Sequence, residues 1–353
     1  MMRRFWPMLP VLLAGLLLPV AASAMHFKQL QEDWPAREAV GNSHEEVSVT
    51  SRSPFMLSDV GKGSNANPET EITVDLYIPK EASADNPVPA VVLLHGAAGV
   101  IGSRERLYAQ QFAEMGIAAA VVDAFSPRRE MATGFIDRLL NITETMMLAD
   151  AYATLKHLDE RSDVDGSKVA LMGFSYGGMA TVFAAYEQVA EMLATEGQRF
   201  AAHVSFYGPC IARFDRNEAT GAPVLMLLGA EDEITDPQRC REIAQDLEEG
   251  GSPSEVVVYE GAYHQWDGSR PGPRRIGRNL APCEFRVDEQ GNAREGFIGL
   301  AMDGPFMRKA ILGLCSDSDG YLMGRDDSVR AQSNADVGEL LGRTFSPHGE
   351  ARN

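Results

Sequence analysis

The sequence predicts an α/β protein built on a doubly wound, mostly parallel sheet that is flanked by helices. Two observations predict this class. Segments that are apolar throughout recur along the chain, as expected for strands buried on both faces of a parallel sheet. Stretches with apolar residues at helical spacing lie between them, and strands that alternate with helices form such sheets. With 353 residues, 44% of them hydrophobic, the chain can also bury a large core.

The expected strands follow in chain order. Two of them, within 46–50 and over 72–78, alternate apolar with polar residues and should each have one exposed face. The others are continuously apolar or nearly so. They are expected over 90–94, 117–122, 168–173, 201–206, 223–228 and 255–259.

Helices are expected between these strands, over 104–115, over 137–161, after Tyr176, and over 237–248, where Pro237 suits the first helical position. The alternation stops near residue 282, and 306–314 and 329–341 remain as helix candidates. We therefore predict a single domain over 25–353, in which 25–70 is an N-terminal extension and 282–353 a C-terminal extension.

The first 24 residues have the features of a secretory signal peptide in the usual order. Arg3 and Arg4 form a basic start, 8–21 is apolar, and Ala-Ser-Ala over 22–24 is a small-x-small cleavage site. A membrane anchor is the alternative, but the apolar stretch is short for a bilayer. We expect an exported protein, periplasmic or secreted, without a membrane anchor after cleavage.

The acidic composition limits the classes of partner that the protein is expected to bind. The formal net charge is −18, and an acidic protein repels phosphate backbones and anionic lipid surfaces. We expect no nucleic-acid partner. The oligomeric state stays open.

Four cysteines follow the predicted cleavage site: Cys210, Cys240, Cys283 and Cys315. An even number in an exported protein favours two disulfides over free thiols, with three possible connectivities. Zinc binding is disfavoured because no two cysteines have the C-x₂₋₄-C spacing.

A candidate nucleophile lies in Gly-Phe-Ser-Tyr-Gly over 173–177, which matches G-x-S-x-G with Ser175 at its centre. The pattern alone is common, but here it follows a buried strand and precedes a helix. That strand–turn–helix context is what a nucleophile elbow requires. The alternative is a glycine-rich turn in which the serine caps a helix.

A serine hydroxyl needs a base, and the base needs an acid to orient it. His264 lies in the loop after the last strand, at the edge of the sheet where reactive residues gather. Asp232 follows the strand that ends at residue 228, although Glu231, Glu233 and Asp236 compete with it. The order Ser175, Asp232, His264 is that of α/β-hydrolases.

A candidate oxyanion loop follows the first buried strand, in His-Gly-Ala-Ala-Gly over 95–99. It is similar to the HGGG-type loop, whose small residues let the backbone approach a substrate carbonyl. The backbone N–H groups of Ala97 and Tyr176 are the expected donors. A glycine-rich turn is the alternative reading, and His95 is expected to brace the loop rather than to catalyse.

Together these segments resemble the dienelactone hydrolase family over roughly 71–267. The likeness rests on GFSYGG from residue 173, GAEDEITDP from residue 229 and GAYHQWD from residue 261. The resemblance implies an α/β-hydrolase fold, hydrolysis of small esters, lactones among them, and neither metal nor organic cofactor. It places nucleophile, acid and base on Ser175, Asp232 and His264.

The sequence also departs from that family. Dienelactone hydrolase proper has a cysteine nucleophile and a glutamate in the oxyanion loop, whereas this chain has Ser175 and His-Gly-Ala over 95–97. Exported members of the family carry cysteines at the positions of Cys210 and Cys240. The resemblance therefore implies the pairs Cys210–Cys240 and Cys283–Cys315.

Two other functions remain open. A serine peptidase of the prolyl-oligopeptidase type shares this fold, but no propeller precedes the core. A catalytically inactive binding module is the second alternative, although no member of the triad is evidently lost. The substrate itself is not predicted, and Arg128, Arg129 and Trp266 are equally open to pocket-lining and to surface or packing roles.

Overall fold

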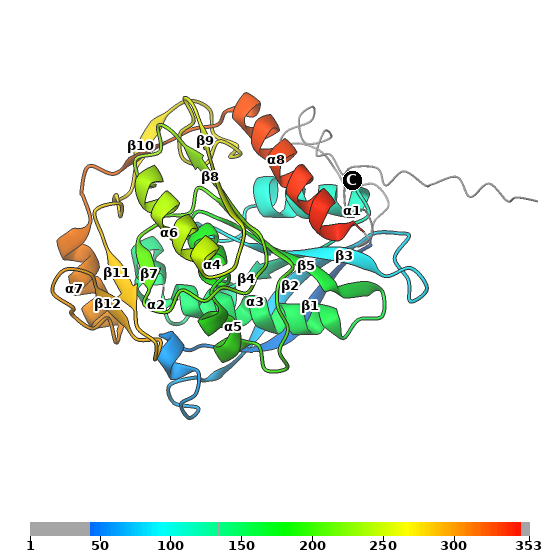
Figure 1. Cartoon of the computed structure of the whole chain (residues 1–353), viewed down its shortest axis with the longest axis horizontal. Helices are drawn as coiled ribbons and strands as arrows, with labels where there is room; N and C mark the ends of the chain where they lie inside the picture. Colours follow the sequence, from blue (N-terminus) through cyan, green and yellow to red (C-terminus); the bar gives the residue numbers. More distant parts are fainter. Residues whose placement is uncertain (1–42, 133, 347–353) are drawn as a thin grey trace, which may run out of the picture.

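The computed structural model describes residues 43–132 and 134–346, so the predicted signal peptide lies outside the described residues. Eight strands form the central sheet, in the order β1-β2-β4-β3-β5-β6-β8-β9 (Figure 1). Their bounds are β1 (Ser43–Arg52), β2 (Glu69–Ile78), β3 (Val88–Leu94), β4 (Ala118–Asp123), β5 (Val164–Phe174), β6 (Ala202–Phe206), β8 (Val224–Gly229) and β9 (Ser254–Tyr259). β1 and β2 run antiparallel to their neighbours, and all other pairings are parallel.

Eight α-helices accompany the sheet in the part of the chain that the structure describes. They are α1 (Leu107–Glu114), α2 (Phe135–Asn141), α3 (Glu144–Asp159), α4 (Tyr176–Phe183), α5 (Glu187–Leu193), α6 (Pro237–Glu249), α7 (Pro305–Cys315) and α8 (Asp327–Phe345). A π-helical turn, η3 (Gly102–Arg106), leads into α1. Short strands lie outside the sheet: β7 (Ala212–Phe214), β10 (Arg274–Ile276), β11 (Phe285–Val287), β12 (Ala293–Glu295) and β13 (Tyr321–Met323).

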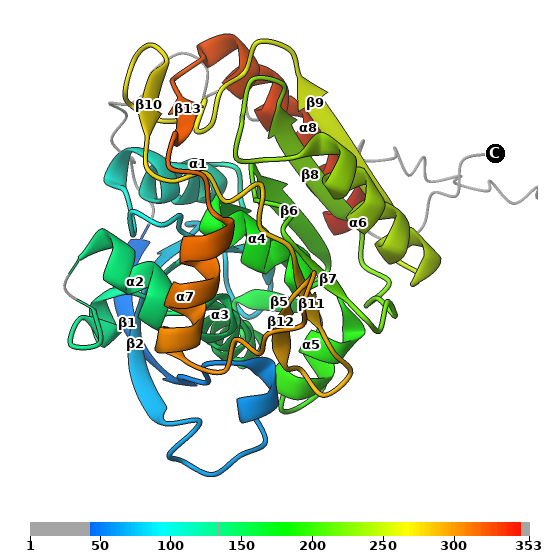
Figure 2. The same ribbon diagram turned by 90° about the vertical axis from the view of Figure 1, so that its left-hand side faces the viewer.

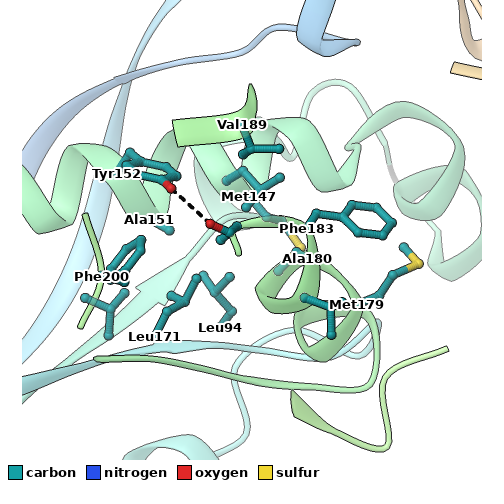
Figure 3. Close-up of a cluster of buried hydrophobic side chains, with 14 of the residues drawn as sticks. Leu94, Met147, Ala151, Tyr152, Leu171, Met179, Ala180, Phe183, Val189 and Phe200 are labelled. Atoms are coloured by element: carbon teal, nitrogen blue, oxygen red, sulfur yellow. Dashed lines mark hydrogen bonds between the residues drawn. The ribbon is translucent and has the colours of Figure 1, made fainter. Parts of the chain in front are cut away.

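The helices cover both faces of the sheet. Side chains alternate along a strand, so Val91 and Leu93 of β3 belong to the core under α1 and α8. Val92 and Leu94 point to the other face, under α3 to α6. Figure 3 shows this second core, where the Tyr152 hydroxyl donates to the Ala184 carbonyl over 3.3 Å. The α/β-hydrolase architecture predicted from the sequence is the one observed.

The long helix predicted over 137–161 is wrong as a single element, because the structure divides it into α2 and α3. Ile142 adopts an extended conformation, and the Thr143 hydroxyl caps α3 by accepting from the Met146 N–H. Threonine and β-branched residues favour such a boundary. Apolar spacing continues through the break, and for that reason the periodicity does not reveal it.

The two predicted extensions are closely joined to the core. β1 lies within the expected N-terminal extension, yet it pairs along its whole length with β2 at the edge of the sheet. In the C-terminal extension, α8 packs on the core and β13 pairs with β10. Among the described residues, no helix combines the length and the hydropathy that crossing a bilayer requires.

Candidate active site

Ser175 occupies a sharp turn between β5 and α4. Its φ of 53° and ψ of −111° are strained for a residue with a side chain. The flanking glycines make the turn possible. A Cβ at Gly173 would lie 2.1 Å from the Gly177 carbonyl oxygen, and a Cβ at Gly177 would lie 2.5 Å from the Leu94 carbonyl oxygen. The sequence therefore folds here into the elbow that its G-x-S-x-G pattern predicts.

The side chains of Ser175, His264 and Asp232 form one hydrogen-bonded row. Nε2 of His264 lies 2.9 Å from Oγ of Ser175, and its Nδ1 lies 2.7 Å from Oδ2 of Asp232. His264 is fully buried and Ser175 keeps 6% of its surface exposed. In the tautomer that suits both bonds, Nδ1–H donates to the carboxylate and Nε2 accepts from the hydroxyl. This arrangement can deprotonate Ser175 and hold the resulting imidazolium.

The structure distinguishes Asp232 from the three competing carboxylates. Glu231 and Glu233 are exposed, and Glu233 pairs with Arg275 over 2.7 Å. Asp236 caps α6 by accepting from the backbone at its first turn. Only the carboxylate of Asp232 contacts His264 among these four acids.

The loop after β3 packs against the turn that carries Ser175. A Cβ at Gly96 would lie 3.2 Å from the Phe174 carbonyl and 3.4 Å from Cβ of Ser175, so the backbone beside Ala97 approaches the nucleophile closely. Tyr176 is the first residue of α4, where an N–H has no acceptor within the helix. Both expected oxyanion donors thus come from segments adjacent to Ser175.

His95 braces this loop. Its Nδ1 lies 2.8 Å from the Gly96 carbonyl, and its Nε2 accepts from the Ala124 N–H over 3.2 Å. The ring is buried, and burial lowers the pKa of His95 below the ordinary histidine value. A neutral imidazole that joins the ends of β3 and β4 is a structural group, as expected from the sequence.

Tyr207, which was not anticipated from the sequence, packs directly on the His264 ring. Its ring centroid lies 4.7 Å from that of His264, and its hydroxyl donates to Oδ1 of Asp267 over 2.5 Å. Tyr207 has a φ of 42°, rare for a tyrosine. Burial raises the pKa of Asp267 to about 6, although Arg104 and Tyr207 oppose the shift. Asp267 is the last residue of the GAYHQWD motif, but the motif does not indicate its pairing with Tyr207.

The side chain of Tyr176 is held by a largely buried ion pair. Its hydroxyl lies 3.0 Å from Oε2 of Glu144, the first residue of α3, and Nη2 of Arg308 in α7 donates to it over 3.2 Å. Burial would raise the pKa of Glu144, but the charge and hydrogen bonds of Arg308 bring it below the usual value. Glu144 and Arg308 were also not anticipated.

The residues left open as pocket candidates have other contacts. Arg128 forms a buried ion pair with Asp150, with a shortest separation of 2.7 Å, and Arg129 is exposed. Trp266 is fully buried and donates to the Ser333 hydroxyl over 3.0 Å. Arg128 and Trp266 therefore serve packing and internal pairing.

The structure contains two disulfides, Cys210–Cys240 and Cys283–Cys315, with Cα–Cα distances of 5.2 and 4.9 Å. These are the pairs that the family resemblance implies. Cys315 is the last residue of α7, so the second bond ties that helix to the segment before β11. Across 43–132 and 134–346, no group of three or more His, Cys, Asp or Glu side chains is arranged to hold a metal ion.

Comparison with known proteins agrees with this fold. The chain is 22% identical over 191 residues to a probable 2-oxo-3-(5-oxofuran-2-ylidene)propanoate lactonase of a Bradyrhizobium species, a match that covers 50% of this chain and 73% of the relative. The crystal structure of P91, a dienelactone hydrolase-like promiscuous phosphotriesterase from metagenomic libraries, superposes with a TM-score of 0.52 at 19% identity, over 86% of this chain and 100% of that one. The structure named m3DLH superposes with a TM-score of 0.51 at 18% identity, over 86% of this chain and 99% of that one.

The fold and the elbow that carries Ser175 define an α/β-hydrolase. The model of the dienelactone hydrolase family matches residues 72–272, which include all three residues of the row. The chain belongs to the dienelactone hydrolase family, and it is a hydrolase.

Proposed function

We propose that this protein is an exported serine hydrolase that cleaves carboxylic esters, lactones included, through an acyl-enzyme intermediate. One observation carries the proposal: Oγ of Ser175, the imidazole of His264 and the carboxylate of Asp232 lie in one continuous row, with separations of 2.9 and 2.7 Å. Such a row activates a hydroxyl as a nucleophile near neutral pH.

In the first step Oγ of Ser175 attacks the ester carbonyl carbon while Nε2 of His264 accepts the hydroxyl proton. Asp232 stabilises the imidazolium that forms. The N–H groups of Ala97 and Tyr176 donate to the oxyanion, and losing one such donor costs about 3–4 kcal/mol of transition-state stabilisation. The imidazolium then protonates the leaving alcohol, which departs and leaves an acyl-serine.

In the second step water replaces the alcohol. His264 accepts a proton from water, and the resulting hydroxide attacks the acyl-serine carbonyl. Collapse of this intermediate releases the carboxylic acid, and the proton returns to Oγ of Ser175. In a lactone the leaving alcohol stays attached to the acyl group, so the product is a single hydroxy acid. Every proton is transferred by groups of the chain or by water.

Fluorophosphonate labelling tests the nucleophile. We expect the wild-type protein to be labelled covalently at Ser175 and the Ser175→Ala variant not to be labelled. Ser167→Ala is a matched control, because Ser167 is exposed near the start of β5, the strand that ends at the nucleophile turn. Folded wild-type protein that resists the probe would instead support a binding module.

A substrate panel then separates ester from peptide hydrolysis. We expect turnover of p-nitrophenyl esters of short acyl chains and of simple lactones. Cleavage of peptide p-nitroanilides at a higher kcat/KM than any ester would identify a peptidase and overturn the proposed substrate class.

Export is part of the proposal and is supported by the two disulfides, which persist in oxidising compartments. We expect protein recovered from the periplasm or the medium to begin at Met25. Peptide mapping without reductant should yield the linked pairs Cys210–Cys240 and Cys283–Cys315. An intact N-terminus on the native protein would argue against cleavage of a signal peptide.

A further inference from the structure

The family match ends at residue 272, yet chain beyond it contacts the candidate site. Residues 305–345 comprise α7, β13 and α8, and we call them the C-terminal segment. Figure 2 shows β13 beside β10 and α7 beside α2. The segment contacts the site at two places, the loop that carries His264 and the side chain of Tyr176.

The first contact is a set of backbone hydrogen bonds around the base. The His264 N–H donates to the Leu322 carbonyl over 3.1 Å, and the His264 carbonyl accepts from the Gly324 N–H over 3.0 Å. Two residues further along, the Trp266 carbonyl accepts from the Asp326 N–H over 2.9 Å. The base loop therefore pairs with the C-terminal segment much as one strand pairs with another.

The side chain of Tyr321 adds to this first contact with the loop that carries His264. Its ring lies 5.0 Å from the His264 ring at 81°, an edge-to-face geometry, and it is 8% exposed. The next residue joins the acid loop as well, because the Leu322 N–H donates to Glu233 over 3.1 Å. One short strand thus contacts both the base loop and the residue next to Asp232.

The other contact comes from α7. Arg308 donates to both carboxylate oxygens of Glu144, over 3.2 and 2.7 Å, and to the Tyr176 hydroxyl over 3.2 Å. Its Nε also donates to the Leu139 carbonyl in α2, over 2.9 Å. The position of Tyr176 next to the nucleophile therefore depends on a helix about 130 residues further along the chain.

We propose that the C-terminal segment is a working part of the hydrolase site, in which Tyr321 positions the base His264 and Arg308 positions the oxyanion donor Tyr176. This inference rests on the proposed function. It assigns to residues outside the family match a role in alignment, because Tyr321 and Arg308 act through groups that touch the substrate. Displacing a catalytic group by about 1 Å can cost about 10²-fold in rate, so supports of this kind affect turnover.

The first test replaces Tyr321. We expect Tyr321→Leu to lower kcat by about 10–100-fold while KM changes by less than about 3-fold, because alignment is lost and substrate contacts are kept. Tyr321→Phe keeps the ring against His264 and should retain kcat within about 2-fold. Each kcat is normalised to the serine that a fluorophosphonate titrates, so that a loss of folded protein does not count as a loss of turnover.

The second test replaces Arg308 by lysine, which keeps the charge beside Glu144 but cannot make the same set of hydrogen bonds. We expect kcat per titrated serine to fall by about 3–10-fold, with little change in KM. Lys309→Met is the matched control, since Lys309 is the exposed neighbour in the same helix, and it should behave as wild type.

The outcomes are distinguishable. Wild-type protein that is not labelled would overturn the proposed function and, with it, this inference. Wild-type protein that is labelled and active, with Tyr321→Leu and Arg308→Lys both turning over as fast per titrated serine, would overturn the inference alone. If Tyr321→Leu does not fold, Arg308→Lys against Lys309→Met decides the question, because its buried charge pair is retained.

Discussion

The turn that carries Ser175 and the loop that carries His264 are joined by one hydrogen bond, but different kinds of contact hold them in place. The turn at Ser175 is held by steric limits at its two flanking glycines, where a Cβ would lie 2.1 Å from the Gly177 carbonyl oxygen or 2.5 Å from the Leu94 carbonyl oxygen of β3. The loop at His264 has its backbone bonds and ring contacts to residues around 207 and 321–324. The residues that permit the turn at Ser175 therefore lie within five positions of one another, although β3 packs against them, whereas no short sequence pattern contains the residues that hold the loop at His264.

This difference explains where tolerance to change should lie. A local turn fails when its own residues change, whereas a loop supported by distant contacts fails through residues that no local pattern marks.

Ser175 and His264 should be equally necessary for turnover. We expect Ser175→Ala and His264→Ala each to lower kcat by about 10⁵–10⁶-fold, and the double variant to be no worse than either, because nucleophile and base act as a unit. Steady-state turnover of a p-nitrophenyl ester measures this. A double variant much slower than both single variants would mean that the two side chains act independently.

Replacing Asp232, the proposed catalytic acid, should have the next largest effect on kcat. Asp232→Asn keeps the shape but presents the wrong hydrogen-bonding group to Nδ1 of His264, and we expect kcat to fall by about 10⁴-fold. Glu231→Gln, one residue away and exposed, is the control and should change kcat by less than about 10-fold, since Glu231 does not contact His264. Similar losses in both variants would contradict the assignment of the acid.

A single methyl group should disrupt the nucleophile turn. We expect Gly177→Ala to lower kcat by about 10²-fold or more, because its Cβ would lie 2.5 Å from the Leu94 carbonyl oxygen and move the turn. Gly313→Ala in α7 is the matched control, since a Cβ there meets nothing within 4 Å. Wild-type turnover in Gly177→Ala would show that the turn is less constrained than its geometry indicates.

The free energy of unfolding should depend on pH through Asp267, which lies three residues after His264. Burial raises its pKa to about 6, so the folded state binds this proton more tightly than the unfolded state does. The resulting stabilisation is fully present below about pH 4 and is lost as the pH rises through about 6, a contribution of about 2–3 kcal/mol. Asp267→Asn keeps an acceptor for Tyr207 and should remove this component, measured by urea unfolding at pH 4.5 and 7.5.

Much of the fold was predictable from the sequence because it depends on local patterns. Continuous apolar runs identify strands such as β3 and β5, and helical spacing identifies α6. The sequence was insufficient where periodicity runs through a boundary, as at Ile142, and where strands are only three residues long, as for β11 and β13.

The parts of the candidate site also differ in how far they could be predicted from the sequence. The turn at Ser175, the order of the three loops and the residue types they carry were all predictable from the sequence, because they follow from the G-x-S-x-G pattern and from the alternation of buried strands with helices. Only the tertiary structure selected Asp232 among four neighbouring carboxylates and brought Tyr207, Arg308 and Tyr321 to the site. Contacts between residues that lie 32 to 132 positions apart depend on how whole elements pack, and no local pattern records that packing.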